Sequence, residues 1–174
     1  MSFVVIAYPK IDRNDYDWIQ GIRKENDPIM FDVVKPHVTF VFPTNKLDAA
    51  SLTRHVEDHI SGCKSFPVVF DATKVVEDNS KTYTHLFLTP SVGFDNINKL
   101  HDLLYLDDMA SELRLDIPFI PHLGIGTNKD KSSMEKLAKS LAKSGKSIAG
   151  TIDELTLCEY DGKKVTDLQT FSLG

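Results

Sequence analysis

Two Pro-His dipeptides, Pro36-His37 and Pro121-His122, lie about half the chain apart, and each falls in a strand-like segment. These segments are predicted over His37–Phe42 and Phe119–Gly126. Around each one the same order of elements is expected: strand, helix, Pro-His strand, helix, strand. This repetition favours an internal duplication, with two α/β lobes related by a pseudo-two-fold axis and the Pro-His strands set side by side.

The first half supports this order through its apolar spacing. Phe3–Tyr8 is a short apolar run, typical of a buried strand, and helices are predicted at about Asn14–Lys24 and Asp48–Ser61. Phe66–Val76 and Tyr83–Leu88 are predicted to pair as antiparallel strands across a polar turn. No long crossover is then needed between them.

The second half repeats the pattern. A helix is predicted over Asp95–Asp108, and the clearest helical spacing in the chain begins at Met134 and is stopped by Gly145. Ile152–Tyr160 and Val165–Leu173 are expected to form a hairpin about an Asp-Gly turn. The fold class is therefore predicted as α/β (α+β), with two mostly antiparallel sheets flanked by helices around a central cleft.

Composition narrows the classes of function. The 174 residues suit one domain spanning 1–174, and 41% apolar content is enough for a core. A net charge of -5 disfavours binding to long duplex nucleic acid, whereas a nucleotide or strand end needs only a local positive spot. No apolar stretch approaches the roughly 20 residues of a membrane span. Two cysteines in no paired motif favour a reducing compartment, so we expect a cytoplasmic protein. We also expect a monomer.

Alternation along the Pro-His strands places two histidines on one surface. Side chains in a strand alternate between faces, so His37 and Thr39 point the same way. In the second segment His122 and Gly124 share a face, while the residues between and after them face the core. Each strand therefore offers one imidazole to the same open surface, and the first strand also offers a hydroxyl.

Such a pair of imidazoles suits phosphoryl transfer. One histidine can take a proton from the attacking hydroxyl or water while the other gives a proton to the leaving oxygen. An unperturbed pKa of about 6.5 makes both protonation states accessible near neutral pH. The Thr39 hydroxyl can hydrogen-bond a phosphate oxygen. A single histidine on a strand is more often structural, so the interpretation depends on the pairing.

Residues 37–40 (His-Val-Thr-Phe) and 122–125 (His-Leu-Gly-Ile) resemble the paired H-x-T/S-x motifs of the two-histidine phosphoesterases, the 2′-5′ RNA ligase-like superfamily. The resemblance implies a bilobal fold and metal-independent chemistry, without a cofactor, on 2′,3′-cyclic or 2′-5′ phosphodiesters of a nucleotide or RNA end. By matching position, His37 and His122 would be catalytic, and positions 39 and 124 would bind phosphate. Which histidine is the base stays open.

Gly124 departs from the motif because it has no hydroxyl. A hydrogen bond to a charged group contributes about 1.5–3 kcal/mol, so its loss from a transition state would slow the reaction roughly 10- to 100-fold. We therefore expect reduced or specialised activity. The alternative is a non-catalytic module that binds nucleotides or RNA ends on the same fold.

Two further pairs of residues have two interpretations each, and His101 has one. Tyr83 and His85 share a strand face and would either contact a base or ribose in the cleft or pair within an exposed sheet. His55 and His59 have the i, i+4 spacing of some zinc ligands, although a solvated helix face is favoured. His101 is also expected on a polar helix face. No metal site is predicted.

Overall fold

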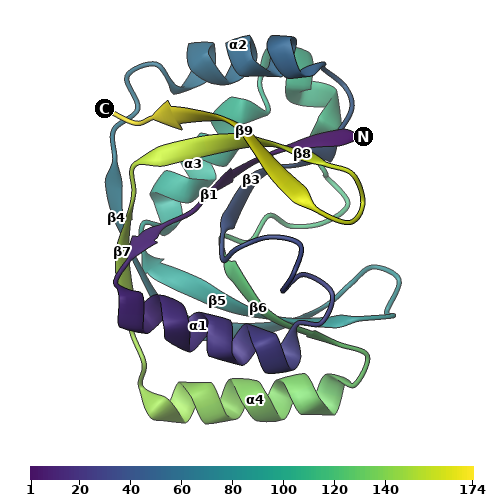
Figure 1. Ribbon diagram of the computed structural model, residues 1–174, viewed down its shortest axis with the longest axis vertical. Helices are drawn as coiled ribbons and strands as arrows, with labels where there is room; N and C mark the ends of the chain where they lie inside the picture. Colours follow the sequence, from purple (N-terminus) through teal and green to yellow (C-terminus); the bar gives the residue numbers. More distant parts are fainter.

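The computed structural model describes residues 1–174 and contains two antiparallel sheets. The four-stranded sheet has the order β3-β1-β8-β9. Its strands are β1 (Ser2–Ala7), β3 (Val38–Thr44), β8 (Glu154–Tyr160) and β9 (Val165–Ser172). It forms the upper half of the molecule in Figure 1, where both chain termini also lie.

The five-stranded sheet has the order β2-β7-β4-β5-β6. Its strands are β2 (Lys10–Ile11), β4 (Phe66–Glu77), β5 (Thr84–Val92), β6 (Leu123–Asn128) and β7 (Ile148–Ile152). Strands β5 and β6 cross the lower half of Figure 1. The predicted fold class, with two antiparallel sheets and flanking helices, is confirmed.

Two of the helices pack on a Pro-His strand from the other half of the chain. They are α1 (Arg13–Asn26), α2 (Ala49–Ile60), α3 (Phe94–Leu104), α4 (Lys131–Ser144) and the short 3-10 helix η1 (Asp107–Glu112). Helix α1 follows β1 and the short β2 but packs on β6, and α3 follows β5 but packs on β3. Helices α1 and α4 lie at the lower end of Figure 1, and α2 lies at the upper end. None of the helices is both long and apolar enough to cross a membrane.

Strands from the two halves of the chain also pair with each other. Strand β4, which closes the first half of the chain, pairs with β5, whereas β8 of the second half pairs with β1. The antiparallel β4–β5 pair and the β8–β9 hairpin agree with the predictions. Each sheet is therefore built from both halves, and each Pro-His strand (β3 and β6) becomes an edge strand of a different sheet.

The two Pro-His strands share an irregularity at the same place. The register between β1 and β3 shifts by one residue at Phe40, and that between β5 and β6 shifts by one residue at Ile125. Each bulge lies three residues after the motif histidine. A bulge bends its strand and redirects the side chains beyond it. At these bulges the two halves of the chain therefore correspond residue by residue.

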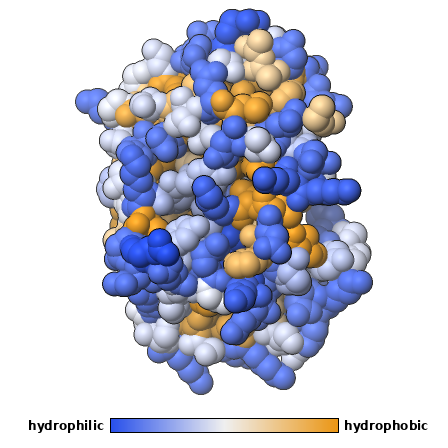
Figure 2. Space-filling model, in the orientation of Figure 1, coloured by the Kyte–Doolittle hydropathy of each residue, from blue (hydrophilic) through white to orange (hydrophobic).

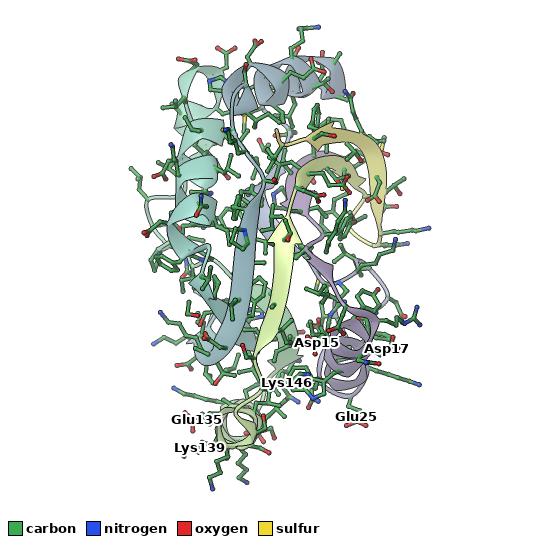
Figure 3. The ribbon with its side chains drawn as sticks, turned by 90° about the vertical axis from the view of Figure 1, so that its left-hand side faces the viewer. Asp15, Asp17, Glu25, Glu135, Lys139 and Lys146 are labelled. Atoms are coloured by element: carbon green, nitrogen blue, oxygen red, sulfur yellow. The ribbon has the colours of Figure 1, made fainter.

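Helix ends follow their sequence signals. Asp12, Asp48 and Asp130 each accept a hydrogen bond from a backbone N–H in the first turn of α1, α2 and α4. Gly145 ends α4 with a φ of 64°, in the left-handed region that glycine tolerates best. Lys146, in the next turn, forms an ion pair with Asp15 of α1 and ties α4 to α1 (Figure 3).

Three boundaries differ from the prediction. The strand expected from Phe119 begins only at Leu123, because Pro121 has no N–H to donate to a neighbouring strand. The helix expected to reach Asp108 ends at Leu104 and is followed by η1. Strand β7 was not predicted. Its Gly150 allows close approach to β2, since a Cβ there would lie 2.6 Å from the side chain of Ile11.

Candidate active site

A cavity of about 510 Å³ opens between the two sheets and is lined by both motif histidines. His37 directly precedes β3, and His122 directly precedes β6, so each imidazole comes from the edge of a different sheet. Apolar side chains, including Phe42, Phe87 and Ile120, form much of the remaining wall. Figure 2 shows several hydrophobic patches on this face, among them one at mid-height and right of centre with hydrophilic residues around it.

The two imidazoles are held in the same way. His37 Nδ1 lies 2.8 Å from the carbonyl oxygen of Lys35, and His122 Nδ1 lies 2.5 Å from that of Ile120. A carbonyl only accepts hydrogen bonds, so Nδ1 carries the proton in both rings. Nε2 is then the nitrogen available to a ligand, as acceptor when the ring is neutral and as donor when it is charged. The prediction of one imidazole from each strand at a shared surface agrees with this geometry.

Burial favours the neutral form of both rings. The pKa of His122 is lowered to about 4, mainly by desolvation and in part by the nearby His37, against the opposing effect of the hydrogen bond to Ile120. Desolvation also lowers the pKa of His37, against the opposing effect of the hydrogen bond to Lys35. An anionic phosphate between the rings would raise both pKa values because opposite charge stabilises the imidazolium. The site is thus suited to gaining a proton together with its ligand.

Three rings form a near-parallel row along the cavity wall. Phe87 stacks on His122 with centroids 3.6 Å apart, and His85 follows at 6.0 Å from Phe87. His85 Nδ1 lies 3.2 Å from the hydroxyl oxygen of Thr127. His85 therefore lines the cavity, as one of its two predicted interpretations required. Its predicted contact with a base or ribose stays a prediction.

Of the other predicted site residues, one lines the cavity and two do not. Gly124 lines the cavity, and a Cβ built on it meets no atom within 4 Å. Thr39 is half-buried opposite Ile6 of β1 and is not among the residues that line the cavity. Tyr83 also lies off the lining, with Lys129 Nζ 5.5 Å from its ring centroid. Phosphate contact by positions 39 and 124 therefore stays a prediction.

A buried ion pair lines the cavity and was not anticipated. Arg23 and Asp27 are 1% and 3% exposed. Arg23 donates to the carbonyl oxygens of Met30 and Val34 at 2.9 and 2.8 Å, which fixes the segment leading to His37. The sequence contained a signal, because Arg23 lies four residues after Ile19 on the buried side of α1.

A second arginine lies at the rim of the cavity. Arg114 contacts Asp116 through two hydrogen bonds of 2.7 and 2.6 Å. Asn79, at the tip of the β4–β5 hairpin, donates to the same carboxylate at 3.4 Å. Both arginines of the cavity wall are therefore already engaged by carboxylates. No sequence pattern pointed to this loop, since it has neither regular structure nor a motif.

The three remaining histidines do not lie on open helix faces. His101 is 3% exposed, stacks on Phe119 at 3.6 Å and hydrogen-bonds the carbonyl of Phe40 at 2.8 Å. His55 is 7% exposed and bonds the carbonyl of Leu104, while His59 is half-buried. The prediction of solvated faces was wrong for both: His55 is buried because α2 packs on α3, and His101 because α3 packs on β3. No group of three or more His, Cys, Asp or Glu side chains is arranged to hold a metal ion.

Fold and cavity together define a two-lobed α/β protein with paired histidines in one cavity. The family model described as the 2′-5′ RNA ligase superfamily matches residues 11–164. The chain therefore belongs to this superfamily, as the resemblance in the motifs implied. No curated protein sequence matches the chain significantly.

Solved structures share the fold at low sequence identity. Usb1 from Kluyveromyces marxianus has a TM-score of 0.59 at 13% identity, covering 99% of this chain and 98% of its own. LigT from E. coli in apo form has a TM-score of 0.57 at 13% identity, covering 99% of this chain and 96% of its own. Usb1 with uridine monophosphate and LigT with 3′-AMP also match, with TM-scores of 0.55 and 0.54, identities of 14% and 12%, and coverage of 99% of this chain and 98% and 97% of theirs.

Proposed function

We propose that this protein is a metal-independent phosphoesterase that opens a 2′,3′-cyclic or 2′-5′ phosphodiester of a nucleotide or RNA end. The observation that carries the proposal is the matched pair of imidazoles, each with Nδ1 held by the carbonyl two residues before it and Nε2 left for a ligand. Membership of the superfamily supports phosphoester chemistry at the level of the family. Fold relatives that hold uridine monophosphate and 3′-AMP support a nucleotide as ligand.

The proposed reaction uses one imidazole as base and the other as acid. Nε2 of the neutral histidine takes a proton from water as its oxygen bonds to phosphorus. The bond from phosphorus to the 2′ or 3′ oxygen breaks, and Nε2 of the protonated histidine gives that oxygen its proton. The products are a phosphomonoester and a free hydroxyl. Every atom of the products comes from the water and the phosphodiester.

The direct test is turnover of 2′,3′-cyclic mononucleotides in the presence of EDTA. His37→Ala and His122→Ala should each reduce the rate by about 10²- to 10⁴-fold, the contribution of a positioned acid or base. His59→Ala, a histidine outside the cavity, serves as the matched control. Full activity in both motif variants, or activity that EDTA abolishes, would contradict the proposal.

A second candidate function is a non-catalytic module that binds nucleotides or RNA ends in the same cavity. The specific observation in its favour is Gly124, which lacks the hydroxyl of the second motif. Calorimetric binding of a 2′,3′-cyclic nucleotide without any turnover would support this module over the enzyme. Binding lost in both histidine variants would still locate the ligand between the two rings.

A further inference from the structure

Asp27 is a buried carboxylate with few close partners. It is 3% exposed at the C-terminal end of α1. Its Oδ2 accepts from Arg23 Nε at 3.4 Å, and its Oδ1 accepts from the backbone N–H of Met30 at 3.4 Å. Charge-assisted hydrogen bonds are normally about 2.7–2.9 Å, and an ionised carboxylate has about four acceptor sites. The side chain thus retains unused capacity to accept hydrogen bonds.

Arg23 neutralises this carboxylate without saturating it. The guanidinium makes closer contacts elsewhere, at 2.8 Å to the carbonyl of Val34 and 2.9 Å to both Met30 and Gln20. These contacts anchor Arg23 to α1 and to the segment before His37. The guanidinium is therefore held in place and leaves acceptor sites of Asp27 unoccupied.

Asp27, with its unused hydrogen-bond acceptor sites, lies in the proposed active site. Asp27 lines the same cavity as His37, His85 and His122. Burial lowers the pKa of His37 and of His85, and the negative charge of Asp27 counteracts this lowering in both rings. A hydrogen-bond donor on a ligand held at the histidines would therefore have this acceptor within the same cavity.

The charges around the cavity disfavour a second anionic group. Three carboxylates line it, those of Asp27, Glu77 and Asp78. The only lysine or arginine side chains among the lining residues are Arg23, which is buried, and Arg114, which is engaged by Asp116. A phosphate beyond the reacting one would meet no free cation and would have to displace an existing ion pair.

We propose that Asp27 is a specificity-determining residue that accepts a hydrogen bond from a hydroxyl or amine on the uncharged part of the substrate. The cavity then selects cyclic phosphodiesters whose organic part carries a donor and no second anion, such as nucleoside 2′,3′-cyclic phosphates with a free 5′-hydroxyl. This inference rests on the proposed function and narrows its substrate class.

The test compares wild type with Asp27→Asn on two substrates. Adenosine 2′,3′-cyclic phosphate carries donors, whereas ethylene phosphate presents the same cyclic diester with none. The variant should lower kcat/KM for the adenosine substrate by about 10- to 100-fold, the value of a hydrogen bond to a charged group, mainly through KM. Ethylene phosphate should lose much less, because it reports only the effect of the Asp27 charge on the pKa of His37. Asp17→Asn, the same change on the exposed side of α1, is the control and should alter neither (Figure 3).

Two analogues distinguish the source of the donor. The cyclic phosphate of 5′-deoxyadenosine lacks the ribose hydroxyl, and that of purine riboside lacks the amine. Whichever group contacts Asp27, its removal should reduce the effect of Asp27→Asn. Adding a 5′-phosphate to the adenosine substrate should raise KM in wild type, a comparison that needs no variant and holds even if Asp27→Asn fails to fold.

The outcomes separate this inference from the proposed function. Equal losses on both substrates, no loss on either, or a 5′-phosphate that improves KM would overturn the role of Asp27. Wild type that hydrolyses neither substrate would contradict the proposed enzyme instead. Calorimetric binding of adenosine 2′,3′-cyclic phosphate then still decides on Asp27, since an unchanged dissociation constant in Asp27→Asn would refute it.

Discussion

The ring of Phe87 lies against the imidazole of His122, with centroids 3.6 Å apart and planes inclined by 22°. Phe87 is the cross-strand neighbour of Gly124, whereas the corresponding pair in the other sheet is Ile6 and Thr39. The second motif therefore combines a missing hydroxyl with an aromatic ring on its histidine. At this position the two halves have the same strand pairing but different side chains.

Phe87→Leu should loosen His122 and hydrate it. An aromatic pair contributes about 0.5–1.5 kcal/mol beyond its buried area, so we expect kcat to fall roughly 2- to 10-fold. As water reaches the ring, the pKa of His122 should rise from about 4 toward 6.5, which NMR titration measures directly. Phe119→Leu, which removes the equally close stack on His101, is the control. An unshifted His122 titration would refute this role of Phe87.

Gly124→Thr should restore the absent hydroxyl. A Cβ at this position meets no atom within 4 Å, so the first atom of a side chain fits without displacing its neighbours. We expect turnover of 2′,3′-cyclic nucleotides to rise by about 10- to 100-fold, as the new hydroxyl bonds a charged phosphate oxygen. Gly124→Ala adds the Cβ alone and should give no gain. No change in Gly124→Thr would count against the idea that the missing hydroxyl limits activity.

The pH profile of kcat/KM should be bell-shaped, with its maximum below pH 6.5. This parameter reports the free enzyme, in which one histidine must be neutral and the other protonated. Burial lowers the pKa of both rings, to about 4 for His122, so the doubly neutral form dominates at neutral pH. Activity should therefore rise as the pH falls from 7 and decline once both rings are charged. A maximum above pH 7 would be inconsistent with these shifts.

Arg23→Met should destabilise the protein and also slow catalysis. The substitution leaves the Asp27 charge buried without its partner, which typically costs about 3–5 kcal/mol of unfolding free energy. It also frees the carbonyls of Met30 and Val34, which position the segment before His37. Urea unfolding measures the loss. Arg13→Met, in an exposed pair on the same helix, should unfold like wild type, and similar curves for both variants would exclude a structural role for Arg23.

The sequence was informative where local spacing decides the outcome. Alternation in the second motif correctly placed Leu123 and Ile125 in the core, and both are fully buried. The aspartates that cap helices and the glycine that ends α4 act through bonds within a few residues of themselves. The motif histidines are similar, because each is held by a carbonyl only two residues away.

Contacts between distant segments were not predictable in this way. Phe87 stacks on His122 because β5 and β6 pair in one register, and nothing near Phe87 in the chain specifies that register. The neighbours of His101 in its own helix indicate a polar face, yet the packing of α3 places its ring against the backbone carbonyl of Phe40. Such positions depend on how elements far apart in sequence pack together.

Local sequence therefore determined most of the elements, their order, and the two histidines with their orienting carbonyls. Only the tertiary structure decided what surrounds those rings: the aromatic wall, the buried pair of Arg23 and Asp27, and the engaged arginine at the rim. The physical reason is that hydrogen-bonding patterns and side-chain periodicity act over a few residues, whereas burial and electrostatic environment sum over every segment that packs nearby.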